Sequence, residues 1–159
     1  MEAISIDVNN DKKIVLSAVD LVIKFNLRGR TLTAIRGASL DLYEGESLAI
    51  VGESGSGKSV FAKSFIGLLD ANGWVDSGNI MYKGVDIGKF KKEKPWLKIR
   101  GKEIAMVFQD PMTALSPLKT IGKQIAEAVE LHRGLKGKIA KNIVLEILKD
   151  VGISSPTER

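Results

Sequence analysis

Apolar residues that alternate with polar ones, many of them β-branched, predict the strands of this protein. Alternation of this kind marks a strand with one buried face. Residues 14–25 are expected to form one or two strands, residues 31–42 a further strand pair, and residues 47–51 and 103–109 one strand each. Within residues 31–42, Ala38, Leu40 and Leu42 share one face. Residues 75–86 predict a hairpin with turns at Ser77-Gly78 and Lys83-Gly84, because glycine tolerates the backbone angles of tight turns.

Apolar residues spaced three and four apart predict three helices. The first covers residues 60–66 and ends in the Asn- and Gly-containing stretch before residue 74. The second covers residues 120–132, with Ile121, Ile125, Ala128 and Val129 on one stripe, and the third covers residues 138–151. The only histidine, His132, is interpreted as a helix-end residue, which the helix dipole favours, and not as a ligand. We expect these strands and helices to form an α/β fold.

A glycine-rich loop, Gly52–Ser59 (GESGSGKS), lies between the expected strand at 47–51 and the helix at 60–66. It fits the pattern of Gly, four free positions, Gly, Lys and Ser or Thr that binds phosphates. Strand, glycine loop and helix are the context in which this pattern functions. A chance match in a glycine-rich turn is the alternative, and the flanking strand and helix argue against it.

The chemistry of this loop points to a nucleotide. Gly52, Gly55 and Gly57 let the backbone approach a ligand, so that several N–H groups face one concavity at the start of a helix. Lys58 supplies a positive charge for the β and γ phosphates of ATP, and Ser59 a hydroxyl for the Mg²⁺ that bridges them.

Composition narrows the range of functions. The chain has 159 residues and no cysteine, which excludes disulfides and thiolate metal sites. No apolar run approaches the roughly 20 residues of a membrane span. The net charge of +5 is concentrated in residues 89–102. A nucleic-acid or phospholipid patch is one interpretation; we favour the solvated face of a short helix with Trp96, Leu97 and Ile99 inward, because no row of aromatics accompanies the lysines. We expect no nucleic-acid partner.

Two motifs together resemble a known family. GESGSGKS and the later stretch Phe108-Gln109-Asp110-Pro111-Met112-Thr113-Ala114-Leu115-Ser116-Pro117 look like the phosphate loop and the Q-loop of an ABC transporter ATP-binding subunit. More narrowly, they resemble the branch that imports oligopeptides, dipeptides and nickel. The resemblance covers about residues 15–159. An unrelated phosphate-loop kinase or GTPase is disfavoured, since those enzymes have no such Q-loop.

The resemblance implies a set of site residues. ATP would be held by the loop residues Gly52, Glu53, Ser54, Gly55, Ser56, Gly57, Lys58 and Ser59, together with Val60 and Gln109. Ser59 and Gln109 would approach Mg²⁺. In the family an aromatic residue ahead of the loop stacks on adenine. Phe25 is our candidate, with a core role as the alternative, and Tyr43 is a weaker one because it lies close to the loop.

The resemblance also implies an architecture and partners. We expect a flexible segment at residues 1–13 and the N-terminal part of an ABC-type ATP-binding domain at 14–159. That part would hold a partial phosphate-loop core, an antiparallel β subdomain and a helical subdomain from about residue 118. Expected partners are transmembrane permease subunits, a second ATP-binding subunit and, indirectly, an external solute-binding protein. The expected location is the cytoplasmic face of the membrane.

The family's signature segment, its Asp-Glu strand and its switch histidine are not found in these 159 residues. We therefore expect an N-terminal fragment whose full-length form hydrolyses ATP to power peptide uptake. The fragment by itself should show little or no ATPase turnover. The alternative is a truncated nucleotide-binding or assembly module that functions without turnover.

Overall fold

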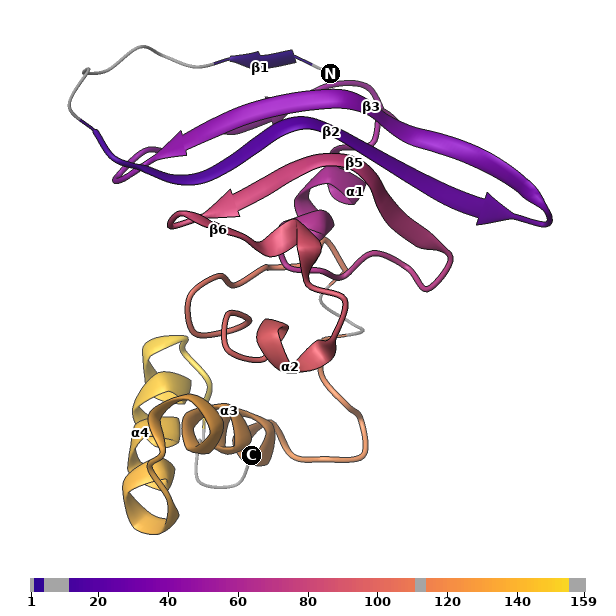
Figure 1. Ribbon diagram of the computed structural model, residues 1–159. Coiled ribbons are helices and arrows are strands. Elements are labelled where there is room, and N and C mark those ends of the chain that lie inside the picture. Colours follow the sequence, from indigo (N-terminus) through magenta and orange to yellow (C-terminus); the bar gives the residue numbers. More distant parts are fainter. Residues whose placement is uncertain (1, 5–11, 111–113, 155–159) are drawn as a thin grey trace. The chain divides into compact units, whose positions relative to one another are not determined.

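The computed structural model describes residues 2–4, 12–110 and 114–154 (Figure 1). The chain divides into two compact units, residues 1–100 (unit 1) and residues 101–159 (unit 2). None of the helices among the described residues is long and apolar enough to cross a membrane.

An antiparallel sheet with the strand order β3-β2-β5-β6 dominates unit 1 (Figure 1). Its strands are β2 (Ile14–Leu27), β3 (Arg30–Tyr43), β5 (Gly73–Tyr82) and β6 (Val85–Asp86). β2 and β3 form one long hairpin whose turn residues, Arg28 and Gly29, both have positive φ, the geometry that matches strand twist. Strand structure at 14–25 and 31–42 is thus confirmed, but each region forms one continuous strand, so the strand pair expected at 31–42 is wrong.

The core of unit 1 lies between this sheet and the helix α1 (Lys58–Ser64). Leu21, Ile23 and Ile80 from the sheet are fully buried. From the helix side, Phe61 is buried and its ring meets that of Phe65 edge-on, with 4.9 Å between ring centroids. The aromatic spacing that predicted this helix therefore marks its packed face.

The strand that precedes the glycine loop is β4 (Ala49–Val51). It pairs antiparallel with β1 (Glu2–Ile4), so three residues that we expected in a flexible N-terminal segment form a strand. The rest of that segment, except Lys12 and Lys13, lies outside the described residues.

The predicted turn at Ser77-Gly78 is wrong, whereas the one at Lys83-Gly84 is confirmed. β5 runs straight through Ser77-Gly78, at a shift in the register between β2 and β5. Gly78 has φ +85° and faces Asp20, which also has positive φ. The glycine therefore serves a bulge, which needs the same backbone freedom as a turn. Nearby, Lys24 and Trp74 donate to Asp76 and lower the pKa of that carboxyl.

After β6 the chain forms the 3₁₀ helix η1 (Ile87–Lys89) and the short helix α2 (Glu93–Trp96). Trp96 is buried as expected, but Leu97 is 63% exposed, so its predicted inward orientation is wrong. The Trp96 ring occupies the space beside Gly67, where an added Cβ would lie 2.6 Å from its Cζ2. Trp96 therefore packs beside Gly67, just after α1, and Leu97 is left in solvent.

Arg100 joins α2 to the end of α1. Its guanidinium donates from Nε to the Ile66 carbonyl and from Nη2 to the Gly67 carbonyl, both at 2.7 Å, and it pairs with Glu93. Both carbonyls belong to the turn that directly follows α1. The sequence placed Arg100 in a solvated basic stretch, but its side chain is only 21% exposed.

We expect Arg100→Met to destabilise unit 1 by about 2 kcal/mol, because two carbonyls lose a charged donor. The midpoint of urea unfolding, followed by tryptophan fluorescence, measures this. Lys98→Met, which removes a charge from an exposed side chain in the same segment, should change the midpoint little. Equal effects of the two substitutions would contradict the role assigned to Arg100.

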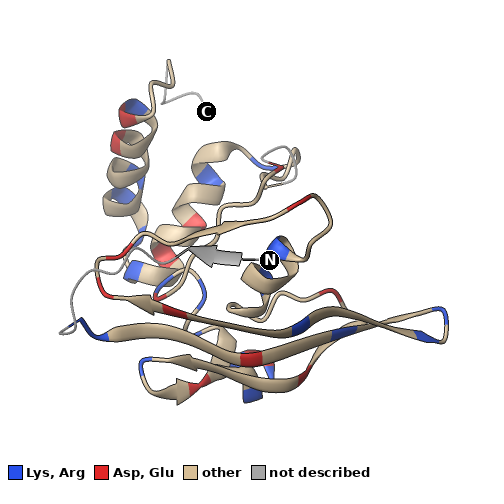
Figure 2. Ribbon diagram, turned by 90° about the horizontal axis from the view of Figure 1, so that it is seen from above, with Lys and Arg blue, Asp and Glu red and all other residues tan. Residues whose placement is uncertain are grey.

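Unit 2 contains two helices, α3 (Ile121–Arg133) and α4 (Gly137–Asp150), which confirm the predicted pair. They pack through Val129 of α3 and the buried row Ala140, Val144 and Leu148 of α4. Ala128 is exposed, so the expected buried stripe of α3 is narrower than predicted. Acidic and basic residues are both present along α4 (Figure 2).

The predicted strand at 103–109 is wrong. Only Ile104 has a bridge partner, and Val107 is 96% exposed. A strand needs a neighbour for its N–H and C=O groups, and the described part of the chain places none beside this segment. Its β-branched and apolar residues therefore form an extended, unpaired stretch.

Candidate nucleotide-binding site

The glycine loop leads from β4 into α1 and lies directly on the sheet. Gly57, the residue before α1, has φ +96°. A Cβ at this position would lie 2.7 Å from Cδ1 of Ile35 and 3.2 Å from the Ala34 carbonyl, both in β3. The position requires glycine for its backbone angle and for its space. The contact with β3 thus restricts the conformation of the loop at Gly57.

Lys58 places its ammonium group within the loop. Its Nζ donates to the Gly52 and Glu53 carbonyls, each at 2.7 Å, and lies 3.4 Å from Oγ of Ser56. A backbone bond from the Ser56 N–H to the Glu53 carbonyl closes the loop on itself. The positive charge of Lys58 is therefore held within the loop, and its contact with a phosphate stays a prediction.

The other predicted loop residues are mostly exposed. Ser54 and Gly55 are exposed, and Gly55 has φ +79°. Ser59, in the first turn of α1, is exposed, and its hydroxyl makes no hydrogen bond to a described residue. Its oxygen is therefore available to a ligand, as a Mg²⁺ site requires.

No group of three or more His, Cys, Asp or Glu side chains in the described ranges could hold a metal ion. A Mg²⁺ ion at Ser59 would therefore take most of its other ligands from phosphate and water, the usual arrangement for this ion at nucleotide sites. The free hydroxyl of Ser59 fits this arrangement.

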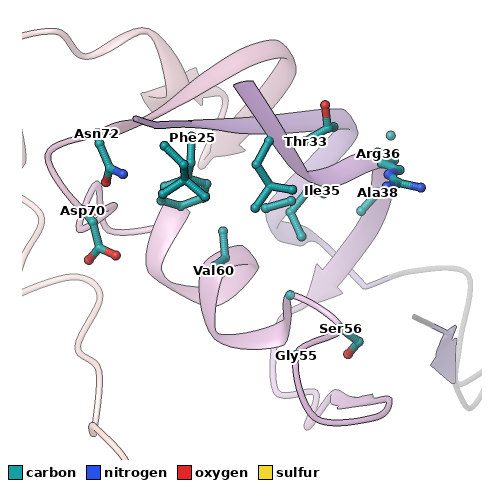
Figure 3. Close-up of a pocket in the computed structure, with 15 residues that line it drawn as sticks. Phe25, Thr33, Ile35, Arg36, Ala38, Gly55, Ser56, Val60, Asp70 and Asn72 are labelled. Carbon is teal, nitrogen blue, oxygen red and sulfur yellow. The ribbon is translucent and has the colours of Figure 1, made fainter. Parts of the chain in front are cut away.

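A pocket of about 790 Å³ extends from the loop between α1 and the β2–β3 hairpin (Figure 3). Gly55, Ser56 and Gly57 line the end at the loop, and Val60 lines the side formed by α1. β2 and β3 supply an apolar wall that includes Phe25, Leu32 and Ile35, and Asp70 and Asn72 lie at the end away from the loop. The pocket therefore joins an apolar surface to a cationic loop.

Phe25 lies in this pocket and also in the core. The residue is 9% exposed, and its ring packs on Gly73, where a Cβ would lie 2.5 Å from Cε1. Tyr43 pairs with Ile14 at the opposite end of the hairpin and does not line the pocket. The geometry therefore favours Phe25 over Tyr43 as the aromatic beside a ligand, and its stacking role stays a prediction.

Gln109 belongs to unit 2, where it lies exposed at a bend. Its expected approach to the phosphates and Mg²⁺ remains a prediction. The loop that follows it is tied to α3: the Ser116 N–H donates to Oε1 of Gln124 at 2.8 Å, and Nε2 of Gln124 donates to the Ser116 carbonyl at 3.0 Å. Residues 111–113 of the Q-loop lie outside the described residues.

Sequence reasoning missed the residues that complete the pocket, Leu32, Ile35, Asp70 and Asn72. The pairing of Phe25 with Leu32 could have been found by counting outward from the Arg28-Gly29 turn. Nothing local marks Asp70 and Asn72, whose place follows from the bond between the Asn26 N–H and the Asn72 carbonyl, 2.8 Å long.

Comparison with known proteins identifies the family of this chain. The family model described as ABC transporter matches residues 35–159. The oligopeptide transport ATP-binding protein AmiE of Streptococcus pneumoniae is 49% identical over 149 residues, which are 94% of this chain and 42% of the relative. The dipeptide transport ATP-binding protein DppD of Bacillus subtilis is 47% identical over 146 residues, 91% of this chain and 43% of the relative. The chain thus spans less than half the length of these relatives.

Among solved structures, the ATP-binding cassette MJ0796, described as a dimer in a post-hydrolysis state bound to ADP and Pi, matches with a TM-score of 0.72. It is 25% identical, and the match covers 88% of this chain and 58% of that one. The fold is therefore that of a partial phosphate-loop ATPase, and the chain belongs to the ABC transporter family.

Proposed function

We propose that this chain is the nucleotide-binding part of an ATP-binding subunit that serves a peptide importer. The observation that carries the proposal is the Lys58 ammonium held inside the glycine loop, whose residues Gly55, Ser56 and Gly57 line the same pocket as Phe25. The relatives named as oligopeptide and dipeptide transport ATP-binding proteins support the choice of transporter.

In this proposal ATP lies along the pocket. The triphosphate occupies the loop, where Lys58 meets the β and γ phosphates and the loop N–H groups surround them. Adenine lies against the apolar wall at Phe25 and Val60. An aromatic face accepts any purine, so this contact supplies affinity more than selectivity. The Ser59 hydroxyl would bind Mg²⁺, and the charge of this ion would offset that of the phosphates. Gln109 is the second residue expected to approach Mg²⁺.

Hydrolysis and transport are proposed for the whole protein. A second ATP-binding subunit would complete the site, and the MJ0796 dimer supports a pairing of this kind. Movement at Gln109 would pass through the loop anchored by Gln124 to α3 and on to permease subunits. An external solute-binding protein would deliver the peptide, and the subunit would lie at the cytoplasmic face of the membrane.

The test is calorimetric titration of the protein with ATP and with adenosine. Phe25→Leu keeps apolar bulk at this buried position but removes the aromatic face. This substitution should lower the affinity for both ligands by roughly three- to tenfold, since a stacked aromatic pair contributes about 0.5–1.5 kcal/mol. Phe25→Tyr should restore the affinity.

Two results would contradict this assignment. Unchanged affinity for both ligands in Phe25→Leu would remove Phe25 from the site while leaving the loop in place. Failure of the unsubstituted protein to bind ATP at all would overturn the nucleotide-binding proposal itself.

A further inference from the structure

A second hollow in unit 1 shares no lining residue with the nucleotide pocket. It is a groove of about 570 Å³ between the β5–β6 hairpin and the segment that carries α2. Its floor is apolar. The floor residues are Val85, Ile87, Phe90, Pro95 and Ile99.

Lysines form the rim of this groove. Lys92, Lys94 and Lys98 line it, and all three side chains are exposed. None of the three forms an ion pair with a residue that the structure describes, whereas the neighbouring Lys89 pairs with Asp86 at 2.8 Å. The one acidic residue within the segment, Glu93, is engaged by Arg100. The rim therefore carries positive charge that the described part of the chain does not neutralise.

This combination has a chemical counterpart. An apolar floor favours a ligand with an apolar side chain, because their contact removes the apolar surfaces of the floor and of that side chain from water. Three uncompensated ammonium groups around it favour carboxylates at the edge of the same ligand. We propose that this groove, which we call the lysine-rimmed groove, binds a peptide segment of a partner protein in which apolar side chains are flanked by Asp or Glu.

The shape of the groove favours a peptide over an anionic membrane. Binding to a lipid surface requires apolar groups that protrude past the basic side chains into the bilayer. Here Ile87 is fully buried, and Phe90 packs edge-on against Trp96 with 5.4 Å between ring centroids. Ile87 and Phe90 are thus held within the fold and do not protrude past the lysines.

Fluorescence anisotropy with a labelled synthetic peptide of alternating leucine and glutamate tests this proposal. We expect saturable binding that weakens as salt rises, because exposed charges contribute to it. The double variant Lys94→Glu, Lys98→Glu should bind at least about tenfold more weakly. Lys138→Glu, Lys141→Glu makes the same charge change on the exposed side of α4 in unit 2 and should stay within about twofold.

A second variant tests the apolar floor. Val85 is 53% exposed, so Val85→Asp should leave unit 1 folded, and circular dichroism can verify this. The substitution should lower the affinity for the peptide. ATP affinity should not change in any of these variants, so this proposal and the nucleotide proposal fail independently.

Several results would overturn the proposal. These are an absence of saturable binding of the leucine–glutamate peptide, equal binding of a leucine–lysine peptide, and undiminished binding by the lysine double variant. Co-sedimentation with vesicles of phosphatidylcholine and phosphatidylserine without peptide binding would assign the groove to a membrane instead.

Discussion

Replacing Lys58 by alanine should lower the affinity for ATP on the order of a hundredfold, about 2.8 kcal/mol, and leave the affinity for adenosine nearly unchanged. The Lys58 ammonium stands between the Gly52 and Glu53 carbonyls and faces the concavity in which the phosphates would lie. Adenosine has no phosphate, so it should not sense the loss of this charge. Titration calorimetry with both ligands measures the difference directly.

Lys141→Ala is the matched control for this experiment. Lys141 lies exposed on α4 in unit 2 and is not among the residues that line the nucleotide pocket. Its replacement removes an equal charge and should change ATP affinity only slightly. Parallel losses of ATP and adenosine in Lys58→Ala would show that the substitution disturbs the pocket generally, and Lys58 would then have no specific phosphate role.

Gly78→Ala should destabilise unit 1 severely, by roughly 3–5 kcal/mol, because positive-φ strain and overpacking coincide. The new Cβ would lie 2.6 Å from Cα of Leu21 and from the Val19 carbonyl, and it would also meet the Asp20 carbonyl. All three contacts are with the backbone of the central strand β2, which cannot move aside without breaking its pairing with β3 or β5.

Gly84→Ala separates the two causes. Gly84 has φ +82°, close to the +85° of Gly78, but nothing lies within 4 Å of its Cβ position. It should therefore show backbone strain alone, about 1 kcal/mol. Trp74 and Trp96 both belong to unit 1, so tryptophan fluorescence during urea unfolding reports this unit. Similar midpoints for the two variants would contradict the close approach of β2 and β5 at the bulge.

Local features of the sequence predicted the elements well. The hairpin strands, α1, α3 and α4 follow from periodicity, and the Lys83-Gly84 turn follows from its residue types. The side-chain environments in the basic stretch were harder to predict. The sequence does not distinguish a lysine in solvent from an arginine that donates to the carbonyls just after a helix. Arg100 and Lys98 look alike in sequence and have opposite environments in the fold.

Two errors share one cause. Ser77-Gly78 resembled a turn, and residues 103–109 resembled a strand. In both cases the residue types indicate which conformations the backbone can adopt. The presence or absence of a partner strand decides which of them it adopts. β2 lies beside Gly78, and among the described residues no strand lies beside Val107.

The glycine loop could be located from the sequence alone, since eight consecutive residues contain its glycines, its lysine and its serine, and their geometry is local. The surroundings of that loop become visible only in the folded chain. The wall at Ile35, the position of Phe25 beside the pocket and the far end at Asn72 depend on β2, β3 and the turn after α1 meeting in space. Contacts between distant segments arise from packing and strand register, which no short stretch of sequence specifies.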